Sequence, residues 1–217
     1  MAIWIYIVIA ILELGTELVN SFKFRLVMKP LLMPALAFVL WQMGDVQGNF
    51  IHQLVLAGLF FSWIGDIFLM FEQQHEPCFL VGLGSFLIAH ICYIAGFYQA
   101  WGDTSIVVNQ PWFLIPFLLY AFFLLKPMFS KLGPMKIPVV VYALVIMCMM
   151  LSALNLYGEI SNHVFWSIFI GALLFTISDS MIAINKFLKP FPLAKTAIMS
   201  TYIAGQLMIV FGAIQLY

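Results

Sequence analysis

The chain has 217 residues, of which 65% are hydrophobic and 8% are charged, and its mean hydropathy is +1.09. A soluble domain carries about 25% charged residues, and a fold of this size cannot keep so much apolar surface away from water. The composition therefore excludes a soluble domain and predicts a polytopic membrane protein. The formal net charge of zero gives no reason to expect a nucleic-acid partner.

Apolar segments follow one another along the whole chain and are separated by short loops. A spanning helix needs roughly 20 mostly apolar residues, whereas loops gather charge, Pro, Gly and Asn. No segment alternates as the strands of a membrane barrel do. The prediction is an all-α bundle that forms a single domain over residues 1–217, with eight transmembrane helices at 2–20, 30–44, 51–71, 78–100, 107–125, 137–157, 163–185 and 197–217.

The basic residues indicate how the bundle sits in the membrane. All nine of them follow odd-numbered segments, whereas the opposite loops carry Asp45, Asp103 and Glu159. The positive-inside rule then places the basic loops in the cytoplasm and both termini outside, and we expect a bacterial inner (plasma) membrane protein. The basic residues are Lys23, Arg25, Lys29, Lys126, Lys131, Lys136, Lys186, Lys189 and Lys195.

Polar residues interrupt several of the predicted helices toward the cytoplasmic side. An ionisable group in hydrocarbon costs about 2.5–3.5 kcal/mol on insertion scales, so it indicates a function unless it serves only to join helices. Because four carboxylates share one depth, we expect a polar cavity that opens toward the cytoplasm. The residues in question are Glu13, Glu17, Asp66, Ser85, His90, Asp179, Tyr202 and Gln206.

Two of the acids end similar stretches of sequence. GLFFSWIGD (58–66) and GALLFTISD (171–179) both begin with Gly and end with a small residue and Asp. If they are copies of one unit, the bundle consists of two parallel halves of four helices each. Gly65 and Ser178, the small residues before the acids, would let a neighbouring helix or a substrate approach the backbone closely.

Two carboxyl groups in an apolar site can divide an acid–base reaction between them. Desolvation disfavours the anion, and two close carboxylates push their pKa values apart, so that one stays protonated and its partner stays ionised. Cleavage of an acetal-like or enol-ether bond needs both forms. A proton relay in a transporter needs them as well, so this chemistry alone does not choose between the two classes.

No other pattern in the chain competes with the two aspartates. There is no Gly-rich phosphate loop and no His-Glu-x-x-His helix. The three cysteines lie in apolar runs without paired spacing, which is typical of packing residues. We therefore expect neither a metal site nor a cofactor.

Four motifs together are similar to one family. SWIGDIFLM, GLGSFLIAHICYI, GALLFTISDSMIAINKF and TYIAGQLMI resemble the YhhN-like family of membrane proteins, which includes the lysoplasmalogenases. The resemblance implies an eight-helix enzyme that hydrolyses the vinyl ether bond of lysoplasmalogens, releasing a fatty aldehyde and glycerophosphoethanolamine or glycerophosphocholine. It implies Asp66 and Asp179 as the catalytic pair, and His90, Tyr202 and Gln206 as the accompanying polar positions.

The remaining candidates concern the lysophospholipid substrate. Lys186 and Lys189 follow the helix of Asp179, where they could meet the lipid phosphate or serve only as cytoplasmic anchors. Glu13 and Glu17 could complete the cavity or neutralise a headgroup amine. The alternative function is a proton-coupled transporter or lipid flippase, for which polar residues through the full membrane depth and inverted repeats would be expected. A protein with a structural role only would leave the shared depth of the acids unexplained.

Overall fold

The computed structural model describes residues 1–102 and 105–216, and in these ranges it contains helices and loops but no strand. Asp103 in a predicted loop and Tyr217 at the end of the last predicted helix lie outside the described residues. The long helices are α1 (Ala2–Leu18), α2 (Phe22–Met43), α3 (Phe50–Met70), α4 (Glu76–Gln99), α6 (Leu114–Met128), α7 (Lys136–Leu154), α8 (Asn162–Ala183) and α9 (Ala194–Ile214). The short elements are α5 (Ile106–Asn109), the 3₁₀ turns Pro111–Phe113 and Gly133–Met135, and a π-helical turn, Ile184–Leu188.

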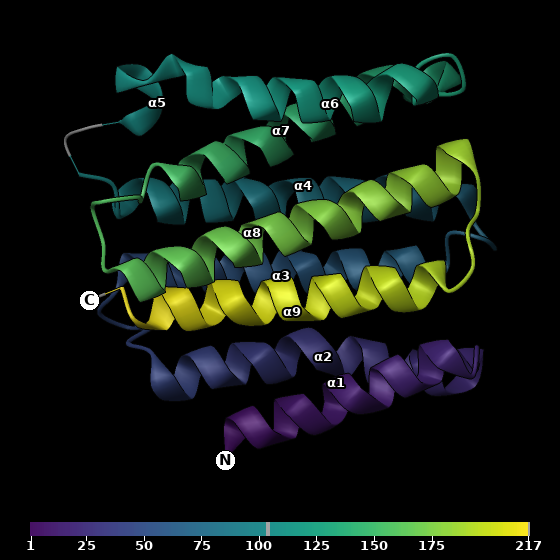
Figure 1. The fold of residues 1–217 in the computed structure, drawn as a ribbon. Coiled ribbons are helices and arrows are strands. Elements are labelled where there is room, and N and C mark those ends of the chain that lie inside the picture. The colour runs from purple at the N-terminus through teal and green to yellow at the C-terminus, as the bar shows by residue number, and fades with distance from the viewer. Residues whose placement is uncertain (103–104, 217) are drawn as a thin grey trace.

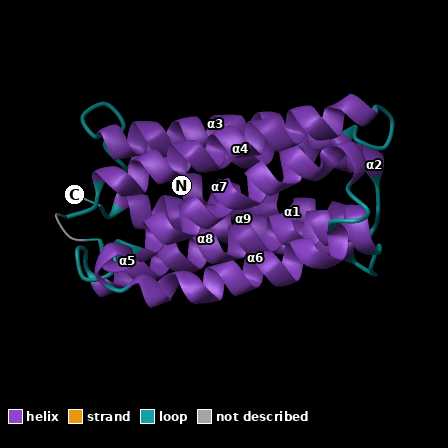
Figure 2. Cartoon of the chain, turned by 90° about the horizontal axis from the view of Figure 1, so that it is seen from above, coloured by secondary structure: helices purple, strands orange, loops and turns teal. Residues whose placement is uncertain are grey.

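The helices form a bundle of the kind that crosses a membrane. In the described part of the chain, 7 helices are long and apolar enough to span, and α1 adds a further long helix of 17 residues. Figures 1 and 2 show the long helices side by side, with the loops gathered at the two ends of the bundle. The prediction of an all-α polytopic membrane protein is confirmed, and the predicted number of spans is approximately right.

The positively charged residues lie at one end of the bundle. The loops that join α1 to α2, α3 to α4, α6 to α7 and α8 to α9 lie at this end (Figure 1). All nine basic residues of the chain belong to these loops or to the helical turns next to them. We call this end of the bundle, which includes loops 19–21, 71–75, 129–135 and 189–193, the basic end.

Helix α2 starts earlier than the sequence predicted. It begins at Phe22 rather than at 30, so Lys23, Arg25 and Lys29 are helical and not in a loop. Pro30 and Pro34 therefore lie inside the helix, where Pro34 has no N–H to donate to the carbonyl of Pro30. The indole Nε1 of Trp63 on α3 donates to that carbonyl instead, at 2.8 Å, and this bond satisfies the group that the proline leaves free.

The predicted helix 107–125 is divided in the structure. α5 ends at Asn109, a 3₁₀ turn starts at Pro111, and the long helix α6 begins only at Leu114. Gln110 has φ −137° and ψ 72°, outside the helical region, because the residue before a proline is pushed away from it. α6 lies on the outside of the bundle (Figure 1), and among its described residues Met128 is the buried one.

Glycines permit the closest contact between helices α8 and α9. A Cβ atom at Gly205 would lie 2.9 Å from the carbonyl oxygen of Gly171 and 2.9 Å from the backbone nitrogen of Phe175. The two backbones therefore approach as small-residue interfaces in membranes do. α3 and α4 form a second closely packed pair (Figure 1). The predicted parallel repeat of these pairs stays a prediction.

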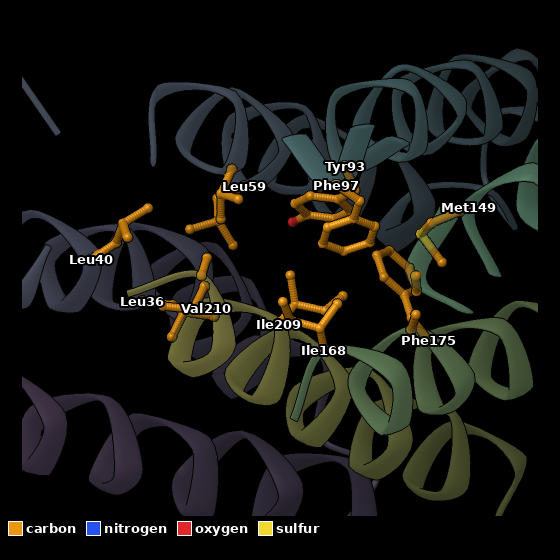
Figure 3. Packing of buried hydrophobic residues seen from close by; sticks show 14 of the residues in the cluster. Leu36, Leu40, Leu59, Tyr93, Phe97, Met149, Ile168, Phe175, Ile209 and Val210 are labelled. Atoms are coloured by element: carbon orange, nitrogen blue, oxygen red, sulfur yellow. The ribbon is translucent and has the colours of Figure 1, made fainter. Parts of the chain in front are cut away.

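The hydrophobic core lies where α2, α3, α4, α7, α8 and α9 meet. Figure 3 shows its side chains pointing toward one another from these helices, and Tyr93, Phe97 and Phe175 are three of its aromatic members. Each of these three aromatic side chains is fully buried. The rigid core holds the neighbouring polar residues of α3, α8 and α9 in fixed positions.

Candidate active site

Asp66 lies in a polar contact between three helices. It is on α3, one turn before the helix ends at Met70, and it is 2% exposed. The hydroxyl of Tyr202 on α9 donates to Asp66 Oδ2 at 2.8 Å, and Lys29 Nζ on α2 lies 3.6 Å from Asp66 Oδ1. Each carboxyl oxygen therefore has its own partner, one neutral and one cationic.

Asp179 has a separate set of partners. It is on α8, one turn before Ala183, and it is buried. The hydroxyl of Tyr142 on α7 donates to Asp179 Oδ2 at 2.7 Å, and Nε2 of His90 on α4 lies 3.3 Å from the same oxygen. The contact with His90 has the distance of an ion pair but not the angle of a hydrogen bond.

The other ring nitrogen of His90 fixes the tautomer. Nδ1 is within hydrogen-bond distance of the carbonyl oxygen of Phe86, and a carbonyl can only accept, so Nδ1 carries the proton. In the neutral ring Nε2 is then a base that faces Asp179.

The two acids are not hydrogen-bonded or ion-paired to each other in the described structure. One partner of each acid, however, contacts the ring of Phe175. Phe175 lies 4.6 Å from the ring of His90 and 5.4 Å from the ring of Tyr202, measured between ring centroids. Both acids also lie toward the basic end of their helices. The structure thus brings the two predicted acids to one level on either side of an aromatic contact.

A charged cleft opens at the basic end, next to Asp66. Its volume is about 400 Å³, and its wall comes from the basic ends of α1, α2, α3, α8 and α9. Lys29 both lines the cleft and pairs with Asp66, so this acid lies directly beneath the lining. The charged lining residues are Glu17, Arg25, Lys29, Glu72, Lys186 and Lys195.

A much smaller cavity lies beside Asp179. Its volume is about 40 Å³, and it is formed between α6, α7 and α8 by mostly apolar side chains. Its polar lining consists of Asp179, Tyr142, Tyr120 and Ser180, of which the last two are hydrogen-bonded to each other. This volume is sufficient for one or a few water molecules but not for a lipid.

The predicted glutamates of α1 are both buried. Glu13 accepts a hydrogen bond from Thr16 Oγ1 at 3.1 Å on Oε2, and its Oε1 has no hydrogen-bond partner among the described residues. Glu17 forms an ion pair with Arg25 at 3.1 Å and lines the cleft. Glu17 is therefore part of the cleft, whereas Glu13 is not one of its lining residues.

Two further predicted residues make hydrogen bonds that join or stabilise helices. Ser85 donates to the carbonyl of Val81 in its own helix at 2.8 Å. Gln206 accepts from Tyr93 at 2.6 Å and donates to Ser62 at 3.0 Å. The Gln206 side chain therefore connects α9 to α3 and α4, and its hydrogen bonds within the described residues go to Tyr93 and Ser62 rather than to either acid.

The two predicted lysines differ in position. Lys186 lines the cleft and forms an ion pair with Glu72 at 3.1 Å. Lys189 is exposed and is not among the residues that line the cleft. The structure thus brings one of the two, Lys186, to the charged cleft.

Sequence reasoning missed four charged residues of the cleft, Arg25, Lys29, Glu72 and Lys195, and also Tyr142, the partner of Asp179. Arg25 and Lys29 were placed in the loop before a helix predicted to start at residue 30, and Lys195 was used only for orientation. Tyr142 is a single tyrosine in an apolar run, and its only signal was a hydroxyl at mid-helix. Among the described residues, no group of three or more His, Cys, Asp and Glu side chains is placed to hold a metal ion.

The chain is similar to proteins that are named lysoplasmalogenase or lysoplasmalogenase homolog. Lysoplasmalogenase TMEM86B of Homo sapiens is 33% identical over 193 residues, which cover 88% of this chain and 76% of the relative. Lysoplasmalogenase TMEM86A of Bos taurus is 32% identical over 164 residues, or 74% of this chain and 65% of the relative. A lysoplasmalogenase homolog of Dictyostelium discoideum is 33% identical over 155 residues, or 61% of this chain and 50% of the relative.

No solved structure matches the chain. Its sequence does match a family over most of its length, and the matched range includes both acids, Lys29 and the whole cleft except Glu17 and Phe22. On this match over residues 24–213, the chain belongs to the YhhN family.

Proposed function

We propose that this protein is a lysoplasmalogenase. It would hydrolyse the vinyl ether bond of alkenyl glycerophosphoethanolamine or alkenyl glycerophosphocholine to a fatty aldehyde and the glycerophospho-alcohol. The observation that carries the proposal is the position of Asp66, a buried carboxyl group beneath a cleft that holds both positive and negative side chains. The relatives named as lysoplasmalogenases support the same reaction and not the transporter alternative.

The charges of the cleft suit the headgroup of such a lipid. A lysophospholipid with ethanolamine or choline carries one phosphate and one ammonium group. Arg25, Lys186 and Lys195 offer donors to the phosphate, as Arg and Lys commonly do. Glu17 and Glu72 offer carboxylates to the ammonium group. A phosphate alone would need no acidic residues in the lining.

Asp66 is the acid that we assign to the reacting carbon. Proton transfer from Asp66 to the β-carbon of the vinyl ether converts the ether oxygen and the α-carbon into an oxocarbenium ion. Tyr202 and Lys29, which contact the two carboxyl oxygens, hold the side chain in place for this transfer. Asp66 leaves the step as a carboxylate and stabilises the cation.

Asp179 and His90 are assigned to the water molecule. The cavity beside Asp179 has room for water and presents the carboxylate and the hydroxyl of Tyr142. Water adds to the α-carbon and gives its proton to the Asp179–His90 pair, which yields a hemiacetal. The Asp179–His90 pair returns this proton to the glycerol oxygen as its bond to the hemiacetal carbon breaks. The hemiacetal hydroxyl gives its own proton to Asp66, which restores both acids and leaves an aldehyde and an alcohol.

The orientation follows from the charge distribution. We propose that the basic end lies in the cytoplasm of a bacterial cell and both termini on the opposite side of the inner membrane. All nine basic residues support this placement, because they lie at one end of the bundle. The cleft would then take its substrate from the cytoplasmic leaflet.

An assay of purified protein in detergent tests the proposal. Wild type is expected to release fatty aldehyde from a lysoplasmalogen, and Asp66→Asn and Asp179→Asn are each expected to lower the rate by about 10²–10⁴-fold, the usual contribution of a general acid or base. Glu76→Gln is the matched control, because Glu76 is an exposed carboxylate at the first residue of α4.

The assay tests the proposed reaction and the proposed catalytic residues separately. If wild type releases no aldehyde, the protein is not a lysoplasmalogenase. If wild type is active and both asparagine variants keep its rate, the catalytic residues are misassigned. Thermal unfolding of each variant shows whether a lost rate reflects a lost fold.

A further inference from the structure

A second, apolar groove lies between α2 and α3 on the outside of the bundle. Its volume is about 560 Å³, and none of the described residues that line it is charged. The lining residues are Met33, Pro34 and Ala37 of α2 and Gln53, Leu56, Ala57, Leu59, Phe60 and Trp63 of α3. Pro34 and Phe60 are exposed side chains, so the groove is open to the lipid phase.

The hydrogen bond between Trp63 and Pro30 fixes the alignment of the two helices. Because α2 and α3 run in opposite directions, Ala37 lies at about the level of Leu56 and Ala57. Toward the basic end from this bond lie Lys29, the residue before Pro30, and Asp66, three residues after Trp63, which form the ion pair beneath the cleft. The apolar groove therefore starts at the level where the charged cleft ends.

The order of these features matches the order of groups in one class of lipid. From the basic end inward, the seam of α2 and α3 presents a cleft with both charges, then the acid Asp66, then an apolar groove. A lysoplasmalogen has a zwitterionic headgroup, then glycerol and the vinyl ether, then a single hydrocarbon chain. From Trp63 to Gln53 the groove extends along α3 for roughly 15 Å at 1.5 Å per residue.

We propose that the groove between α2 and α3 binds the hydrocarbon chain of the substrate and sets its preferred length. The proposal rests on the proposed function for the identity of the lipid. The hydrocarbon chain of the lipid enters the groove sideways from the bilayer. Because it moves from one apolar environment to another, hydrophobic transfer contributes little to binding, and the fit of the hydrocarbon chain in the groove decides which chain length is preferred. The cavity beside Asp179 is too small for this role, at about 40 Å³.

A photolabel tests the location without any hydrolysis. An alkyl-ether lysophosphatidylethanolamine, which has no vinyl bond to cleave, carries a diazirine at mid-chain and is irradiated with the full-length protein in lipid nanodiscs. The label is expected on residues of α2 and α3 that line the groove, in particular Ala37, Ala57 and Phe60. An excess of unlabelled ligand is expected to remove this labelling.

Labelling that no competitor removes, or that falls mainly on α6 and α7, would overturn the proposal, since it would represent ordinary lipid contact or another chain site. These results do not depend on whether the protein cleaves lysoplasmalogens. Saturable labelling of the groove without aldehyde release would contradict the enzymatic proposal alone.

Chain-length selectivity provides the second measurement. Ala37→Phe and Ala57→Phe fill the groove at the same level from opposite helices. Each is expected to lower kcat/KM for hexadecenyl lysoplasmalogen at least tenfold and to leave the value for the octenyl substrate within about twofold. The activity that remains on the short substrate shows that the variants fold.

Ala95→Phe on α4 is the matched control, because Ala95 is also half-buried in a helix but does not line the groove. It is expected to affect neither substrate selectively. An equal loss on both chain lengths in the groove variants, or no loss on either, contradicts a chain-binding role for this groove.

Discussion

Tyr202 and Gln206 are one turn apart on α9, but their side chains have different partners. The hydroxyl of Tyr202 donates to Asp66, whereas Gln206 joins Tyr93 to Ser62. We predicted both as substrate-binding residues because they lie at one depth and because the family resemblance implies both as accompanying polar positions. The structure indicates that the tyrosine acts on the acid and that the glutamine holds the helices together.

We therefore expect substitution of Tyr202 to lower kcat and substitution of Gln206 to lower stability. Tyr202→Phe is expected to lower kcat by about 10–100-fold, because a hydrogen bond to a charged group contributes about 1.5–3 kcal/mol. Gln206→Met is expected to leave kcat within about twofold and to lower the unfolding temperature, since it removes two hydrogen bonds of about 0.6 kcal/mol each. Aldehyde-release kinetics and thermal unfolding on both variants provide the comparison.

The opposite effects on kcat and on the unfolding temperature would contradict this distinction. A Tyr202→Phe protein that unfolds earlier but keeps its kcat would make the tyrosine a structural residue. A Gln206→Met protein that loses kcat at an unchanged unfolding temperature would return the glutamine to the active site.

At the scale of elements, the contact of α8 with α9 positions both acids. α8 carries Asp179, and α9 carries Tyr202, the partner of Asp66. Gly171 and Gly205 let the two backbones meet. A side chain at this contact would separate the helices and so displace both Asp179 and Tyr202, the partner of Asp66.

Gly205→Ala is therefore expected to destabilise the protein by about 1–3 kcal/mol and to lower activity in the fraction that stays folded. Gly84→Ala is the control, because a Cβ atom there meets nothing within 4 Å. It removes a glycine from a helix and is expected to be neutral or slightly stabilising. Denaturant or thermal unfolding in detergent measures both, and equal stability of the two variants would contradict the close contact.

The elements also show what the sequence could and could not predict. The lengths of the apolar segments were enough to predict the helices. The free-energy cost of placing a charged group in lipid was enough to identify Asp66 and Asp179 as candidate site residues. The beginning of α2 was missed, because a proline normally starts a helix or stops one, and the bond from Trp63 that permits Pro34 joins residues distant in sequence. Tyr142 was missed for a related reason, since spacing alone does not reveal which helix a hydroxyl faces.

At the scale of the whole molecule, the charge distribution predicts the topology. In a variant without Cys78, Cys92 and Cys148, a single new cysteine is introduced as Gln47→Cys or Lys131→Cys. Both positions are exposed, and they lie in loops at opposite ends of the bundle. In intact bacterial cells a membrane-impermeant maleimide is expected to label position 47 readily and position 131 only after the membrane is permeabilised. Labelling in the reverse order would place the basic end outside the cytoplasm.

The Lys29–Asp66 ion pair lies between the cleft, which faces the aqueous end of the bundle, and the groove, which faces the bilayer. In the proposed reaction this arrangement separates the two products by their solubility. The glycerophospho-alcohol has lost its tail and diffuses away in water, while the aldehyde stays dissolved among the lipid tails. Dilution into two different phases would then oppose recombination, and neither product would have to pass the other on its way out.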